Sequence, residues 1–186
     1  PINADHAAAV VDIGGGTTNV AAIISGSVIA SRAERIGSSD IDVAIMDRLR
    51  RHRGLTIGVQ TAERLKLELS CAIEPEDPYK KVHVRGRDVQ TGSPGAVDLT
   101  AGEVYTITQP IIKRIAQGVR SLLGDLSPEV AGDIFERGLI LTGGGASLEG
   151  LPTYLTNELQ LSVRVADDPR FAIVRGLAQL YDEPLL

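Results

Sequence analysis

Apolar residues follow two different periodicities along this chain, and the first segments have the character of strands. Residues 8–13 are almost entirely apolar, and residues 19–25 are rich in small and β-branched side chains. Residues 27–33 alternate in character after a Ser-Gly turn. Such runs are typical of short strands. The pattern therefore predicts an antiparallel meander of three strands.

A helical spacing of apolar residues follows this meander. Residues 40–53 carry apolar side chains at every third or fourth position, and Gly54 is expected to end that helix. The same spacing predicts a second helix over residues 59–69. Residues 80–99 then change character, because valines alternate with polar residues and Gly86 is expected to make a turn. We interpret this last segment as a small β insertion.

A capping box marks the start of the second half of the chain. The Thr100 hydroxyl and the Glu103 carboxylate can each accept a hydrogen bond from a backbone N–H group at a helix start. The apolar stripe that follows predicts a long helix, with a kink at Pro110 because proline has no N–H group. The other expected elements are a helix from Ser127 to Gly138, a strand over residues 139–141, a helix from about Leu151, a strand over residues 161–165 and a helix over residues 171–181.

The composition narrows the class of protein. The chain has 186 residues, of which 43% are hydrophobic, with no Trp and only two Phe, so a globular core must be built from aliphatic side chains. The net charge is −5. An acidic chain with few aromatic residues is not expected to bind nucleic acid, and the basic segment 48–53 is interpreted as the solvated end of a helix.

Cysteine usage and hydropathy indicate the compartment. Cys71 is the single cysteine, so no disulfide can form within the chain, and three scattered His residues make no metal-binding constellation. No apolar stretch approaches the roughly 18 residues of a membrane span, and no signal peptide is evident. We therefore expect a cytoplasmic location.

Two glycine clusters carry the candidate chemistry. Residues 12–18 read Asp-Ile-Gly-Gly-Gly-Thr-Thr, residues 141–146 read Leu-Thr-Gly-Gly-Gly-Ala, and each cluster follows an apolar run. Glycines at a strand end leave backbone N–H groups open to a phosphate or a flat base, although one such cluster also fits an ordinary tight turn. Two clusters together favour a nucleotide held between two hairpins. The candidate residues are Asp12, Gly14, Gly15, Gly16 and Thr17 in the first cluster and Gly143, Gly144, Gly145 and Ala146 in the second.

Three polar side chains extend this hypothesis. A carboxylate such as Asp12, at the end of a buried strand, can hold Mg²⁺ through water, or it can simply cap the turn. Glu63 and Lys66 lie three residues apart on one face of the second expected helix. They form either an exposed ion pair of little energetic consequence or hydrogen bonds to a ribose or an adenine edge.

The combination of motifs resembles the MreB family, the bacterial actins that determine cell shape. The resemblance covers about residues 8–181 and is carried by the segments 12–18, 36–42, Thr-Ala-Glu-Arg-Leu-Lys at 61–66, Val-Arg-Gly-Arg at 84–87, 136–138 and 141–146. The first glycine motif alone also occurs in Hsp70 chaperones and sugar kinases. The family resemblance implies an α/β fold, namely a lobe of an actin-like ATPase. In that lobe a ribonuclease-H-like subdomain covers residues 1–71 and 100–186, and a small β-rich subdomain is inserted at residues 72–99.

The resemblance also implies the cofactor, ATP or ADP with Mg²⁺, and a role for each candidate residue. Gly15, Gly16 and Thr17 would form the second phosphate loop of the family, and Asp12 would be its Mg²⁺-associated acid. The segment made of Glu63, Arg64, Leu65 and Lys66 would contact the nucleoside. The adenosine loop would run from Gly143 to Ala146.

Two departures from the family pattern lie near this expected site. The Gly-Ser-Ser at residues 37–39 stands where the family usually has Gly-Gly-Asp, and Asp40 and Asp42 could partly substitute for the missing acid. Asn19 stands where the family often has an acid. Either change could weaken nucleotide binding without changing the fold.

The first phosphate loop of the family and its membrane-attachment elements have no counterpart in this sequence. We therefore expect a C-terminal lobe, cut near the domain junction, that supplies half of a nucleotide site. Such a lobe should neither hydrolyse ATP nor bind a membrane by itself. In the intact family the implied partners are further copies of the protein, in a protofilament, and other cell-shape proteins.

Two alternative functions stay open at this point. A lobe of a sugar or acid kinase, or of an exopolyphosphatase, would share the fold and the glycine turns, although the sequence shows no feature of a phosphoryl acceptor site. A binding module without a nucleotide would use the glycines only as turns.

Overall fold

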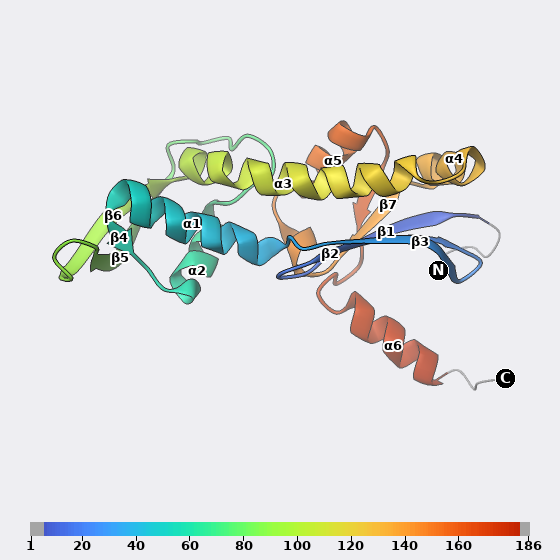
Figure 1. The fold of residues 1–186 in the computed structure, drawn as a ribbon, viewed down its shortest axis with the longest axis horizontal. Coiled ribbons are helices and arrows are strands. Elements are labelled where there is room, and N and C mark those ends of the chain that lie inside the picture. The colour runs from blue at the N-terminus through green and yellow to red at the C-terminus, as the bar shows by residue number, and fades with distance from the viewer. Residues whose placement is uncertain (1–5, 183–186) are drawn as a thin grey trace.

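The computed structural model describes residues 6–182 and has a central sheet of five strands. Their order is β3-β2-β1-β7-β8 (Figure 1). The first three strands are antiparallel neighbours, which confirms the predicted meander, whereas β7 runs parallel to β1 and β8 runs parallel to β7. The five strands are β1 (Ala8–Ile13), β2 (Thr18–Ile24), β3 (Ser27–Glu34), β7 (Leu139–Thr142) and β8 (Val163–Val165).

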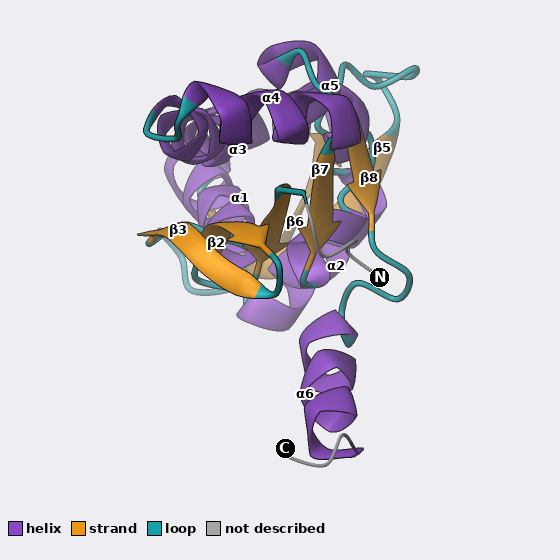
Figure 2. Ribbon diagram, turned by 90° about the vertical axis from the view of Figure 1, so that its right-hand side faces the viewer, coloured by secondary structure: helices purple, strands orange, loops and turns teal. Residues whose placement is uncertain are grey.

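Three helices lie together on one side of this sheet, α3 (Ala101–Gly124), α4 (Pro128–Arg137) and α5 (Leu151–Leu159) (Figure 2). The capping box is present, because Thr100 Oγ1 accepts a hydrogen bond from the Glu103 N–H group at 3.2 Å. Glu103 Oε2 accepts one in turn from the Thr100 N–H group, also at 3.2 Å. Helix α3 packs over β2 and β3, and its aliphatic side chains belong to the first buried cluster.

The other end of the molecule consists of two helices and a small sheet. Helix α1 (Ser38–Arg53) ends at Gly54 in the left-handed conformation, as predicted, and α2 (Val59–Leu69) follows. The three-stranded antiparallel sheet has the order β4-β5-β6 (Figure 1). Its strands are β4 (Leu55–Thr56), β5 (Lys81–Asp88) and β6 (Pro94–Thr100).

The prediction of a turn at Gly86 is wrong. Gly86 lies inside β5, opposite Gly95 of β6, and the chain reverses only after Asp88. A Cβ atom at Gly86 would lie 2.4 Å from the Thr56 carbonyl oxygen. The glycine therefore serves the close approach of β4, a strand too short to be recognised in the sequence.

Two buried clusters divide the aliphatic core. The first lies between the five-stranded sheet and helices α3, α4 and α5, and the second joins α1 and α2 to β5 and β6. Helix α3 contributes to both, with Val104 in the second cluster and Ile112 in the first. The subdomain boundaries at residues 72 and 99 stay a prediction, and α1 and α2, which lie outside them, pack with the small sheet.

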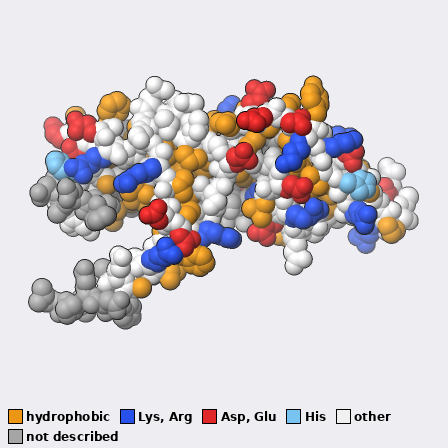
Figure 3. Space-filling view, turned by 180° about the vertical axis from the view of Figure 1, so that it is seen from behind, with side chains coloured by type: hydrophobic (Ala, Val, Ile, Leu, Met, Phe, Trp, Pro, Cys, Tyr) orange, Lys and Arg blue, Asp and Glu red, His pale blue; other side chains and the backbone are white. Residues whose placement is uncertain are grey.

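Helix α6 (Ala172–Asp182) stands apart from both layers (Figures 1 and 2). Its Val174 and Leu177 side chains are 62% and 55% exposed. Figure 3 shows hydrophobic side chains uncovered where this arm leaves the body. Within residues 6–182, none of the helices has the length and apolar character needed to cross a membrane.

Candidate functional site

The direction of three strands brings the candidate site together. Because β1, β7 and β8 are mutually parallel, their carboxyl ends lie at the same edge of the sheet. The first glycine cluster follows β1, the second follows β7, and the segment 166–170 follows β8. Ligands of open α/β sheets bind outside the carboxyl ends of parallel strands.

The first glycine cluster makes an exposed turn that is tied to the start of α1. The Gly14 N–H group donates to Thr17 O at 2.9 Å, and the Ser38 and Ser39 N–H groups donate to the carbonyl oxygens of Gly14 and Gly15. Gly15 and Gly16 are exposed, and their N–H groups form no hydrogen bond within residues 6–182. These two N–H groups are therefore free to bind an anion.

The second glycine cluster packs against the end of β1. Gly143 has a φ of 83°, and a Cβ atom there would lie 2.4 Å from the Ile13 carbonyl oxygen. A Cβ atom at Gly145 would lie 2.3 Å from Ile13 Cγ2. Gly144, in contrast, opens a short 3₁₀ turn, η1 (Gly144–Ser147), and has no atom within 4 Å of such a Cβ. Two of these glycines serve the fold, and Gly144 faces open space.

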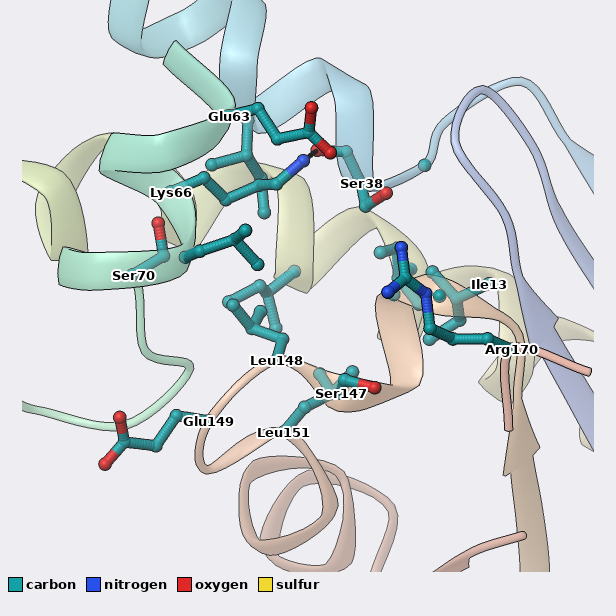
Figure 4. A pocket seen from close by; sticks show the side chains of 17 residues that line it. Ile13, Ser38, Glu63, Lys66, Ser70, Ser147, Leu148, Glu149, Leu151 and Arg170 are labelled. Carbon is teal, nitrogen blue, oxygen red and sulfur yellow. Dashed lines mark hydrogen bonds between the residues drawn. The ribbon is translucent and has the colours of Figure 1, made fainter. Parts of the chain in front are cut away.

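A cavity of about 340 Å³ lies beside these turns, between α2 and the second cluster (Figure 4). Its floor is apolar and includes Ile13, Leu148 and Leu151. The polar side chains on its walls are those of Ser38, Glu63, Lys66, Ser70, Ser147, Glu149 and Arg170. The candidate residues Glu63, Lys66, Gly144 and Gly145 therefore border one cavity.

Lys66 does not pair with Glu63. Its Nζ atom lies 2.8 Å from Asp42 Oδ2 on α1 and 3.3 Å from Ser38 O. The exposed ion pair considered from the sequence is thus replaced by an enclosed one between two helices. Glu63 extends over the cavity without such a partner among the described residues, so its carboxylate can accept hydrogen bonds from a ligand (Figure 4).

The remaining candidate residues do not line this cavity. Leu65 is fully buried in the second cluster, and Arg64 forms an exposed ion pair with Glu68 at 3.4 Å. Asp12 borders a separate shallow hollow that also contains Asn19, its partner on β2. The role of these side chains toward a nucleoside or a metal stays a prediction.

A buried thiol lies behind the cavity wall. Cys71 pairs with Glu149 through an isolated parallel bridge. Burial, and secondly the Glu149 carboxylate, raises the pKa of the Cys71 thiol. This group therefore stays neutral and contributes packing, since only a thiolate would be reactive.

Arg170 is the residue at this site that the sequence analysis missed. The carbonyl oxygen of Pro169 accepts hydrogen bonds from the Gly143 N–H group at 2.8 Å and from Thr142 Oγ1 at 3.0 Å. This holds the loop after β8 against the second glycine cluster, and Arg170 extends into the cavity (Figure 4). The position of Arg170 could have indicated its role, because it follows β8, which is parallel to β7, at the edge of the sheet where ligands bind.

Comparison with known proteins agrees with this geometry. A model of the MreB/Mbl protein family matches residues 1–185. The chain belongs to the MreB/Mbl family. The cell shape-determining protein MreB of Escherichia coli K12 is 41% identical over 176 residues, which are 95% of this chain and 50% of that protein. The chain thus spans about half the length of the curated MreB/Mbl relatives that it matches.

Solved structures show the same actin-like fold. The crystal structure of MreB5 of Spiroplasma citri bound to ADP has a TM-score of 0.90 and 28% identity, and covers 95% of this chain and 54% of that one. The MamK double helical filament has a TM-score of 0.78 at 22% identity, over 96% of this chain and 55% of that one. The expected fold, an actin-like α/β lobe, is confirmed. Membership of the MreB/Mbl family favours the first functional hypothesis over the sugar-kinase alternative.

Proposed function

We propose that the chain is the nucleotide-binding lobe of an MreB-type protein that forms cytoplasmic filaments and determines cell shape. The observation that supports this most is that the second glycine turn, the Glu63 face of α2 and the start of α1 border one cavity of about 340 Å³. The start of α1 is hydrogen-bonded to the first glycine turn. A cavity of that size suits a small organic ligand. The related MreB5 structure is bound to ADP.

Each part of the site has a chemical task in this proposal. The N–H groups of Gly15 and Gly16, with the Thr17 hydroxyl, would donate hydrogen bonds to phosphate oxygens. Glu63 would accept hydrogen bonds from the ribose or the adenine amino group. Gly144 and Gly145 would give the flat base a surface without side chains.

Asp12 could supply one carboxylate ligand to a magnesium ion whose other ligands are waters and phosphate oxygens. Its Oδ1 atom would lie 2.6 Å from a Cβ at Gly143, so it is at the second glycine cluster, and residues 6–182 contain no group of three or more metal-ligating side chains. Mg²⁺ usually keeps several waters and takes further ligands from phosphates, so one carboxylate is sufficient. Bound there, the ion would neutralise part of the phosphate charge.

Nucleotide binding is tested by titrating the purified chain with ADP and Mg²⁺ and following backbone amide signals by NMR, which detects weak binding. Gly144→Val should abolish the shifts around the cavity, because its side chain would occupy the space proposed for the base. The fold should be kept, because a Cβ atom at this position meets no atom within 4 Å. Gly132→Val, at an equally open position on α4, is the matched control and should bind as the wild type does. Unchanged binding by Gly144→Val would contradict the proposed site.

Assembly is the second part of the proposal. A head-to-tail filament needs two different complementary surfaces on every subunit, and we propose that this lobe carries one of them. The chain alone should then form no filaments and hydrolyse no ATP, and it should shorten filaments of E. coli MreB when the two are mixed. Sedimentation with Mg-ATP and electron microscopy test this, and long filaments of the chain alone would contradict it. Contacts with other cell-shape proteins would belong to the intact protein.

A further inference from the structure

We propose that Arg170 binds the phosphate chain of the nucleotide and so makes this lobe prefer nucleotides over nucleosides. This inference rests on the proposed nucleotide function and names the residue that would recognise the charged part of the ligand. Arg170 lines the cavity, and its guanidinium group extends toward Ser38 at the start of α1 (Figure 4).

The charges around the cavity single out this arginine. Two cationic side chains line it, Lys66 and Arg170. The Lys66 charge is already matched by Asp42 at 2.8 Å. Asp168, an acidic residue on the same loop as Arg170, forms an ion pair with Arg175. The Arg170 guanidinium has no ion-pair partner in the part of the chain that the structure describes, so its charge is available to a ligand.

The position of Arg170 assigns it to the phosphate end of the cavity. Ser38 is hydrogen-bonded through its N–H group to Gly14 O, so the start of α1 marks the place of the first glycine turn. Glu63 lies on α2 and Ser70 directly follows that helix, whereas Arg170 reaches the cavity from the loop after β8 (Figure 4). An acidic residue repels phosphate, whereas free N–H groups, a helix start and a guanidinium group attract it.

The backbone around Arg170 holds it in place. The two hydrogen bonds to Pro169 O fasten the preceding residue to the end of β7. The backbone that carries Arg170 is therefore anchored beside the second glycine cluster. A guanidinium fork is suited to phosphate oxygens, which accept two parallel hydrogen bonds from it.

The test is a ligand series with the purified chain. Dissociation constants for adenosine, AMP and ADP are measured by NMR titration for the wild type, Arg170→Gln, Arg170→Lys and the control Arg164→Gln, which removes an exposed arginine on β8 outside the cavity. Arg170→Gln should weaken ADP binding about tenfold, AMP binding less, and adenosine binding less than about twofold, as expected for loss of a charge-assisted hydrogen bond. Arg170→Lys should bind ADP with intermediate affinity, and Arg164→Gln should match the wild type.

The outcomes separate this inference from the proposed function. If the wild type binds neither ADP nor adenosine, the nucleotide function itself fails and the role of Arg170 fails with it. If the wild type binds ADP and Arg170→Gln binds it equally well, only the role of Arg170 is overturned. An equal loss for adenosine and ADP would also overturn it, because the guanidinium group would then contact the nucleoside.

Discussion

Lys66 on α2 and Asp42 on α1 form an ion pair that is almost fully enclosed, with 11% and 7% of their side chains exposed. The Nζ atom lies 2.8 Å from Asp42 Oδ2, while Asp42 Oδ1 has no hydrogen-bond partner among the described residues. The pair joins α1, whose start is hydrogen-bonded to the first glycine turn, to α2, which carries Glu63. It therefore fixes the distance between two walls of the cavity.

Removing one partner of this pair should cost much more stability than removing an exposed pair. Lys66→Met leaves the Asp42 carboxylate enclosed without its counter-charge, and we expect a loss of about 3 kcal/mol in the free energy of unfolding. Arg51→Met, which breaks an exposed pair with Asp47, should cost less than about 1 kcal/mol. Urea unfolding measures both, and equal losses would show that the Asp42 carboxylate is readily solvated.

Gly86 and Gly95 face each other across β5 and β6 but should tolerate alanine differently. A Cβ at Gly86 would lie 2.4 Å from Thr56 O, whereas a Cβ at Gly95 would have its nearest neighbour at 3.4 Å. Gly86→Ala should therefore destabilise the fold by about 1–3 kcal/mol, because β4 must move away. Gly95→Ala should change stability by less than about 0.5 kcal/mol. Similar losses in thermal or urea unfolding would contradict the role assigned to Gly86.

Glu103 should make part of the stability dependent on acid pH. Burial alone raises the pKa of its carboxyl, but hydrogen bonds from Arg53 and Thr100 outweigh this and hold the pKa below the ordinary 4.5. A carboxyl with a lowered pKa in the folded state contributes stability that is full above pH 4.5 and is lost as the pH falls through the folded pKa. Urea unfolding from about pH 7 to about pH 3 should show a smaller loss for Glu103→Gln than for the wild type. Exposed Glu76→Gln serves as the control, and parallel curves for Glu103→Gln and the wild type would contradict this prediction.

Asp12 should matter for nucleotide affinity only when magnesium is present. Asp12→Asn keeps the size of the side chain but removes the charge that would hold the ion. We expect weaker ADP binding than in the wild type with Mg²⁺ and equal binding in EDTA, measured by the same NMR titration. Asn19→Ala, in the same hollow, removes no charge and is the comparison. A loss that persists in EDTA would mean that Asp12 acts on the turn itself.

The sequence predicted the parts of this molecule that depend on local pattern. The meander, the helix that Gly54 ends and the capping box at Thr100 follow from residues close to one another in the chain. The sequence could not predict that Lys66 pairs with Asp42, because that contact joins residues 24 positions apart. It also missed β4, which has two residues, and it missed Arg170, whose significance depends on the parallel pairing of β7 with β8. Long-range pairing decides these features, and no local periodicity encodes it.

Helix α3 has a mechanical consequence for the molecule. With 24 residues it is about 36 Å long, and it runs as one rod from the cluster that contains Val104 to the cluster that contains Ile112. Pro110 lies between these two residues and cannot donate the backbone hydrogen bond that Thr106 O would otherwise accept. The rod is therefore weakest where the two cores meet. Bending one half of the molecule against the other should cost least at this point.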